Sequence, residues 1–258
     1  MTKPFDLAKV RQWAYEAGRL ALRYYQTDLL SEPKADHSPV TEADRLVEQY
    51  LAQKIRAAHP RHGIIGEEFG GAEADREFIW VIDPIDGTRV FIAGLPTWAI
   101  SIGLLRAGAL YRGLVYLPVL DEWYFTNEEG IAYWGQRPLA GRLQTTWHRD
   151  SFICGPSDIP KYFQGNIPRL HSLGAVAAHQ CFVARGAAAA VLAKRPRLWD
   201  LAAPQAILSA VQAVSLHLDG TPLDMAAVLR SRQVHAPLLS GHPVMIERLL
   251  SQIEPRPV

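Results

Sequence analysis

The stretch WVIDPIDGT, residues 80–88, places two carboxylates three residues apart at the end of a hydrophobic run. That run, Phe78–Ile82, is rich in aromatic and β-branched residues, which is typical of a buried strand. Pro84 has no backbone N–H to donate, so we expect it to end the strand, and Gly87 permits a tight turn. We expect a helix to begin near Thr88. The stretch therefore predicts a strand–turn–helix unit.

The two acids of this unit, Asp83 and Asp86, are expected to face the same space as the free N–H groups at the start of the helix. An anion bound to those N–H groups would be repelled by the carboxylates unless cations lay between them. Hard oxygen ligands around a phosphate are what Mg²⁺ uses in proteins. Taken by themselves, the two acids fit a strand-end turn residue and a helix cap equally well.

Composition excludes several classes of protein. The chain has 258 residues, 48% of them hydrophobic, which is enough for one large domain or two tightly packed halves. Its 27 basic and 26 acidic residues give a net charge of +1, so we do not expect nucleic acid as a partner. No apolar run is long enough for a signal peptide or a membrane span, so a soluble cytoplasmic protein is expected. Cys154 and Cys181 are the only cysteines, and we expect reduced, buried thiols.

The first half of the chain reads as helices followed by strands. Apolar residues at helical spacing predict one amphipathic helix over Leu7–Tyr24 and a second after Thr41. Four runs of β-forming residues with short connections then predict an antiparallel sheet. These runs are Phe78–Ile82, Thr97–Leu105, Leu110–Tyr116 and Glu122–Thr126.

Past about Trp147 the pattern alternates between strands and helices, which is typical of an α/β arrangement. The expected elements are a strand around Phe152–Cys154, a helix from about Ser172 to Val183, a short Ala-rich strand, a helix after Asp200 and a strand at Val211–Leu218. We therefore divide the chain into residues 1–147 and 148–258, and expect the two halves to share an interface.

Two further motifs give the acidic stretch a context: IIGEEF at residues 64–69 and LWDLAA at residues 198–203. Together with WVIDPIDGT they resemble the inositol monophosphatase family of Mg²⁺-dependent, lithium-sensitive phosphatases. The resemblance extends from the first helix to about Asp219. It implies a layered α/β/α/β/α sandwich of the sugar-phosphatase type, often found as a homodimer.

The resemblance also implies a set of metal ligands. Glu67, Asp83 and the carbonyl oxygen of Ile85 would hold one Mg²⁺, and Asp83, Asp86 and Asp200 would hold a second. Relatives show a third, weaker Mg²⁺ near Glu67. Two metals can stabilise the attacking and leaving oxygens of an in-line displacement, so that water activated by the metal attacks phosphorus directly.

By the same resemblance Thr88, Asp44 and Glu67 would be the catalytic residues, with Thr88 and Asp44 orienting the attacking water. Backbone N–H groups of Gly87 and Thr88 would bind phosphate oxygens. Asp44 has an alternative interpretation, because Thr41 followed three residues later by an acid is also a capping box at the start of the second helix. The two roles are compatible.

The substrate is less well defined. Relatives that act on inositol phosphates commonly carry a glutamate at the position of Ala193, where it contacts substrate hydroxyls. The basic run that follows it offers Arg195 and Arg197 as ligands for a second phosphate or a carboxylate, although it could equally be a solvated loop. Arg89 follows DPIDGT as it does in histidinol-phosphate phosphatases, which makes it another candidate substrate contact. Lys34 lies in a loop that often covers the metals in relatives.

The leading hypothesis is a Mg²⁺-dependent phosphomonoesterase that hydrolyses a small polyol or sugar phosphate resembling inositol 1-phosphate. One alternative is a histidinol-phosphate phosphatase. Another is a family member with a regulatory role through protein or RNA contacts. No GxSxG, P-loop or HExxH motif supports a serine hydrolase, an ATPase or a zinc enzyme.

Overall fold

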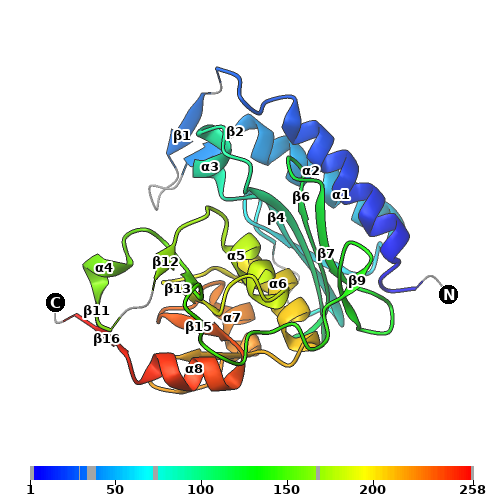
Figure 1. Cartoon of the computed structure of the whole chain (residues 1–258). Helices are drawn as coiled ribbons and strands as arrows, with labels where there is room; N and C mark the ends of the chain where they lie inside the picture. The colour runs from blue at the N-terminus through cyan, green and yellow to red at the C-terminus, as the bar shows by residue number, and fades with distance from the viewer. Residues whose placement is uncertain (1–2, 29, 34–38, 72–74, 167–168, 257–258) are drawn as a thin grey trace.

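The computed structural model of the chain describes residues 3–28, 30–33, 39–71, 75–166 and 169–256. Within these ranges, helices and the two larger sheets, of seven and five strands, lie in five alternating layers (Figure 1). The predicted α/β/α/β/α sandwich is confirmed. No described helix has the length and apolar character needed to cross a membrane.

The first sheet has seven strands that pair in chain order. They are β3 (Gly63–Gly66), β4 (Phe78–Asp86), β5 (Ala99–Arg106), β6 (Ala109–Leu117), β7 (Glu122–Thr126), β8 (Ala132–Trp134) and β9 (Arg137–Pro138). All neighbours from β4 to β9 are antiparallel, as the four predicted runs indicated, whereas β3 pairs with β4 in parallel. The parallel pair brings the ends of β3 and β4 to the same edge of the sheet.

Two helices, α1 (Leu7–Leu22) and α2 (Glu42–Ala58), cover the outer face of this sheet, as Figure 1 shows. A short hairpin of β1 (Ser31–Pro33) and β2 (Pro39–Thr41) connects them. Their apolar stripes enclose the fully buried rings of Trp80 and Trp98. The two predicted amphipathic helices therefore form one wall of the largest hydrophobic cluster.

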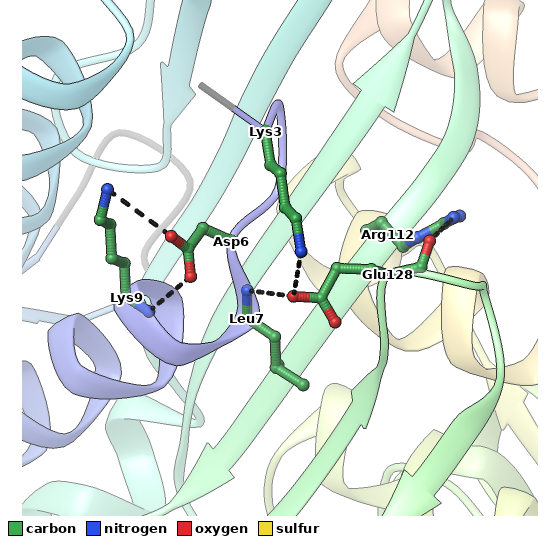
Figure 2. A network of polar contacts seen from close by, with 6 residues as sticks. All are labelled: Lys3, Asp6, Leu7, Lys9, Arg112 and Glu128. Carbon is green, nitrogen blue, oxygen red and sulfur yellow. Dashed lines mark hydrogen bonds and ion pairs between the residues drawn. The ribbon is translucent and has the colours of Figure 1, made fainter. Parts of the chain in front are cut away.

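Glu128, in the connection between β7 and β8, binds the start of α1 (Figure 2). The backbone N–H of Leu7 donates to Glu128 Oε1 at 3.4 Å, and Lys3 Nζ lies 3.9 Å from the same atom. The backbone carbonyl of Glu128 accepts from Arg112 Nη2 at 2.5 Å. Asp6 caps the helix. These contacts fix α1 across the strands.

A middle layer of helices lies between the two sheets and contains α5 (Val176–Ala184), α6 (Leu198–Ala210) and α7 (Met225–Ser231). Gly103 on β5 and Gly113 on β6 are cross-strand partners. A side chain at Gly103 would lie 2.7 Å from Ala202 Cβ, and one at Gly113 would overlap the carbonyl of Ala203. The missing side chains let α6 lie directly on the strands, which positions its first turn.

The second sheet has the strand order β12-β10-β13-β15-β14. Its strands are β10 (Ile153–Cys154), β12 (Leu170–His171), β13 (Ala190–Ala193), β14 (Val214–His217) and β15 (Leu238–Gly241). Its outer side carries α8 (Pro243–Leu250), α4 (Ile159–Tyr162) and the pair β11 (Phe163–Gly165) and β16 (Ile253–Pro255). Parallel and antiparallel pairs both occur in it, as an α/β arrangement predicts.

Some predicted boundaries were wrong. The helix expected from Ser172 begins at Val176, because Gly174 has φ +112°, which no helix allows. The helix placed after Asp200 starts earlier and contains that residue. The last predicted strand begins only at Val214, since Gln212 adopts a left-handed turn with φ +64°. Cys154 and Cys181 are free and buried, as expected. The division at residue 147 stays a prediction.

Candidate metal centre

The strand that carries WVIDPIDGT does not stop at Pro84, contrary to the sequence prediction. β4 continues to Asp86 through a bulge, with Asp83 opposite Ser101 and Asp86 opposite Ala99. Residues three apart on a regular strand point to opposite faces, but one extra residue reverses the alternation. The bulge therefore brings both carboxylates to the same side. It also accommodates a proline without breaking a ladder hydrogen bond.

Asp200 completes a cluster with these two acids. Carboxylate oxygens of Asp83, Asp86 and Asp200 all lie within 4.8 Å of one another. Asp200 is in the first turn of α6, and its Oδ2 accepts the backbone N–H of Arg197 at 2.7 Å. Because α6 packs directly on the first sheet, Asp200, from the second half of the chain, lies at the end of β4.

The start of α5 holds Asp86 in place. The backbone N–H groups of Val176 and Ala177 donate to its two carboxylate oxygens, at 3.2 and 2.5 Å. Gly87, with φ +88°, packs so closely against Ala175 that a Cβ would lie 3.1 Å from that residue's side chain. The turn after β4 therefore needs glycine for its conformation and for its contact with α5.

The electrostatics of the cluster favour a bound cation. Burial, followed by the charges of Glu67, Asp86 and Asp200, raises the pKa of Asp83 well above its ordinary value. Burial raises the pKa of Asp86 to about 7, although its backbone donors act in the opposite direction. Burial and the charge of Asp86 likewise raise the pKa of Asp200.

One atom of the cluster has no partner at all within the described ranges: Asp83 Oδ1 is buried and accepts no hydrogen bond. A buried carboxylate oxygen without a donor is costly unless a cation lies beside it. The donors are carboxylates, with no sulfur or imidazole ligand in the cluster as described, and such oxygen sets suit Mg²⁺ or Ca²⁺. The residues present therefore fit a hard divalent metal.

Glu67 lies just past β3, where its backbone N–H donates to the carbonyl of Ile82 at 3.2 Å. It is half-buried, and its charge reaches Asp83. The carbonyl of Ile85 accepts from Thr88 Oγ1 at 3.3 Å. Among the described residues, the carboxylates that lie within 4.8 Å of one another are those of the three aspartates. Glu67 and the Ile85 carbonyl lie next to this cluster but are not part of it.

Sequence reasoning missed Glu48 on α2. This side chain is 2% exposed, and its oxygens accept the backbone N–H groups of Glu68 and Phe69 at 2.8 and 2.9 Å. The two hydrogen bonds hold the loop that carries Glu67. A signal was available, because Glu48 shares the apolar helical face of α2 with Leu51 and Ile55, where a solvated acid would not be expected.

Asp44 serves two elements at once, as the sequence allowed. Its Oδ2 accepts from the backbone N–H and the hydroxyl of Thr41, at 2.8 and 2.6 Å, so the capping box is present. Its Oδ1 accepts from Thr88 Oγ1 at 3.2 Å. Asp44 is fully buried. Thr88 begins α3 (Thr88–Ile92), which confirms the expected helix start.

A cavity of about 260 Å³ opens beside the acidic cluster, and Asp200 forms part of its wall. Ala193 at the end of β13 also lines it, as do Lys194 and Asp158, whose Nζ and Oδ2 lie 2.7 Å apart. His179 also lines the cavity. Relatives carry a polyol-binding glutamate at the position of Ala193, so the cavity is lined there by a methyl group and not by a carboxylate.

The candidate substrate contacts are spread more widely. Arg195 is exposed and lines the cavity, whereas Arg197 is half-buried and its charge acts to lower the pKa of Asp200. Arg89 is exposed on α3 and is not among the residues that line the cavity. Lys34 lies outside the described residues.

Comparison with known proteins shows which family the chain belongs to. A sequence model of the inositol monophosphatase family matches residues 5–256. The chain is 38% identical to the histidinol-phosphatase of Chlorobaculum parvum over 135 residues, which is 52% of each chain. It is 30% identical to the inositol-1-monophosphatase of Mesorhizobium japonicum over 86% of this chain and 90% of that one, and 34% identical to the Nus factor SuhB of Pseudomonas aeruginosa over 74% and 77%.

Solved structures share the fold. The extragenic suppressor protein suhB of Bartonella henselae has a TM-score of 0.81 at 21% identity, with 95% of this chain and 96% of that one covered. A structure described as an IMPase/NADP phosphatase complexed with Mg²⁺ and phosphate has a TM-score of 0.80 at 19% identity, with 94% and 92% covered.

Proposed function

The chain belongs to the inositol monophosphatase family, and from that premise we propose that it is a Mg²⁺-dependent phosphomonoesterase acting on a small phosphorylated metabolite. Three aspartates within 4.8 Å carry the proposal: Asp83 and Asp86 are buried, Asp200 is half-buried, and one oxygen of Asp83 has no partner. A structural neighbour described as complexed with Mg²⁺ and phosphate supports it. A cytoplasmic homodimer is the expected state.

Asp83, Asp86 and Asp200 would hold one Mg²⁺, and Asp83, Glu67 and the Ile85 carbonyl would hold a second, with a third and weaker Mg²⁺ near Glu67, as in relatives. When bound, Mg²⁺ lowers the pKa of water and offsets the negative charge of the phosphate. The backbone donors from α5 to Asp86 and from Arg197 to Asp200 fix the orientation of both carboxylates. Fixed ligands make a metal site more selective.

Thr88 is proposed to orient the attacking water. The single hydroxyl proton of Thr88 has two acceptors within reach, Asp44 Oδ1 at 3.2 Å and the Ile85 carbonyl at 3.3 Å. If the Ile85 carbonyl binds a metal, the proton goes to Asp44 and the lone pairs of Oγ1 can accept a hydrogen bond from water. Asp44 is held in turn by Thr41, so the pair has one fixed orientation. The N–H groups of Gly87 and Thr88 would bind phosphate oxygens in the same space. Water then attacks phosphorus directly, without a covalent phosphoenzyme.

The identity of the alcohol that leaves is open between two candidates. A polyol such as inositol would find no carboxylate at Ala193, which removes a hydrogen-bond partner for its hydroxyls. Histidinol phosphate is the second candidate, favoured by the 38% identity to a histidinol-phosphatase and by Arg89 after DPIDGT.

A regulatory role is an alternative function, and the relatives named Nus factor SuhB are the observation that favours it. A protein that works only through contacts with RNA or protein has no need of an intact acidic cluster. Co-purification of RNA or of RNA polymerase with this protein would be the result that favours the regulatory role.

Release of inorganic phosphate from a panel of phosphomonoesters tests the proposal. The panel contains inositol 1-phosphate, histidinol phosphate, fructose 1,6-bisphosphate, adenosine 3′,5′-bisphosphate and glycerol 2-phosphate, assayed with Mg²⁺. Asp86→Asn protein is the blank, and Asp75→Asn, an exposed acid before β4, is the matched control. Selective turnover that Asp86→Asn abolishes supports the proposal. Equal rates in wild-type and Asp86→Asn protein would refute the metal assignment.

A further inference from the structure

A second cavity, of about 470 Å³, lies against the outer side of the second sheet. Four cationic side chains line it, Lys161, Lys194, Arg195 and Arg256, together with the rings of Tyr162, Phe163 and His235. No acidic side chain is among its lining residues. We call it the basic cavity.

Two of these cations, Arg256 and Lys194, are held in place. Arg256 follows β16, and its Nε donates to the backbone carbonyls of Pro160 and Phe163, at 3.0 and 3.2 Å. The ammonium of Lys194 lies 3.7 Å above the centre of the Tyr162 ring. A guanidinium anchored by its Nε keeps its two terminal nitrogens available for an anion.

Among the described residues that line the cavity, the charged side chains are all basic. Lys161, Arg195 and Arg256 form no ion pair with any carboxylate in the described ranges. Lys194 does have a partner, Asp158, but that acid lines the cavity beside the acidic cluster instead. Converging cations around a concave space are the usual surroundings of a bound phosphate or carboxylate.

The two cavities share a wall. Lys194 and Arg195 line both the basic cavity and the cavity that contains Asp200. The two cavities therefore adjoin each other at these two side chains. The cations of the basic cavity would not strengthen the binding of a neutral polyol, but they would strengthen the binding of a molecule with an anionic group.

We propose that the substrate carries a second anionic group, a phosphate or a carboxylate, which binds in the basic cavity. The proposal rests on the proposed phosphomonoesterase function, because it assigns one end of the substrate to the acidic cluster. It also accounts for Ala193, since a substrate recognised by its second anion needs no carboxylate there.

Matched substrate pairs test the proposal. Fructose 1,6-bisphosphate is compared with fructose 6-phosphate, and 2-phosphoglycerate with glycerol 2-phosphate, so that phosphate and carboxylate are separate arms. At least one doubly anionic member should have a kcat/KM about tenfold higher than its partner, which is the effect of one charge-assisted contact. Lys161→Gln should reduce that preference. Arg61→Gln, which removes an exposed charge far from the cavity along the chain, should not.

Direct binding separates this proposal from the proposed function. Calorimetric titration of the metal-free protein with pyrophosphate should show binding that Lys161→Gln weakens about tenfold and Arg61→Gln leaves unchanged. The inference would be overturned if the enzyme hydrolysed singly and doubly anionic substrates equally well and pyrophosphate binding did not depend on Lys161. The proposed phosphatase function would still stand. Pyrophosphate binding that depends on Lys161, without hydrolysis of any phosphomonoester, would support the anion site and refute the proposed phosphatase function.

Discussion

Asp44 and Glu48 lie one helical turn apart on α2, and each carboxylate holds a different part of the acidic site. Asp44 accepts the hydroxyl of Thr88 at 3.2 Å, and Glu48 accepts the backbone N–H groups of Glu68 and Phe69 at 2.8 and 2.9 Å. One buried helix face therefore positions both the turn after β4 and the loop after β3.

Glu48→Gln should weaken Mg²⁺ binding. An amide replaces one acceptor oxygen with a donor, which would face a backbone N–H and loosen the loop that carries Glu67. Loss of such an outer contact typically costs about tenfold or more in metal affinity. Calorimetric Mg²⁺ titration measures it, with Glu42→Gln, an exposed acid on the same helix, as the control. Unchanged affinity in folded Glu48→Gln protein would show that the loop is held by other contacts.

Thr88→Val should lower kcat by about a hundredfold with little change in KM, because it removes the hydroxyl that is proposed to orient water and keeps the shape of the side chain. Thr88→Ser retains the hydroxyl and should recover most of the rate. The ratio of the two rates in phosphate release is the measurement. Similar rates for valine and serine would remove Thr88 from the mechanism.

Asp83→Asn should stabilise the metal-free protein. Burial and neighbouring charges raise the pKa of Asp83 in the fold, so its ionised form destabilises the native state at high pH, and the penalty disappears as pH falls through the raised pKa. In EDTA at high pH the variant should be more stable than the wild type, and the difference should shrink in acid. Mg²⁺ should stabilise the wild type only. Thermal unfolding with and without Mg²⁺ checks this, and a less stable metal-free variant would contradict it.

His179 should make stability depend on pH. Burial lowers its pKa to about 4, and its Nε2 accepts the N–H of Leu173 at 2.9 Å, which requires the neutral ring. The unfolded chain binds a proton below its ordinary pKa of 6.5 and the folded chain does not, so stability falls as pH drops from 6.5 towards 4. The loss should reach about 3 kcal/mol.

Urea unfolding of wild-type and His179→Gln protein at several pH values isolates this effect from that of the other titrating groups. The difference in unfolding free energy between the two proteins should change with pH over that window. A constant difference would mean that His179 does not titrate as described.

The sequence predicted much of the site because its motifs are local. WVIDPIDGT specified a buried strand, a turn that needs Gly87 and a helix from Thr88, and the family resemblance placed Asp200 beside it. The bulge at Pro84 was missed, because a proline at a strand end predicts termination until the pairing partner is known. The apolar face of α2 indicated that Glu48 is buried, but not what it binds, because its backbone partners are 20 and 21 residues away.

The outer elements were not predicted either. α8, β15 and β16 contribute Leu239, Ile246 and Ile253 to a core that forms only when distant segments meet. The basic run at residues 194–197 was visible in the sequence, but the sequence could not show that Arg256 lies beside it.

Phosphate release at a series of Mg²⁺ concentrations, with wild-type and Asp86→Asn protein side by side, tests the central claim most directly. Release should rise with Mg²⁺, stop in EDTA and be nearly absent from Asp86→Asn protein that is folded. Release that continues without divalent metal, or that Asp86→Asn leaves near the wild-type rate, would contradict the assignment of the aspartate cluster as the catalytic metal centre.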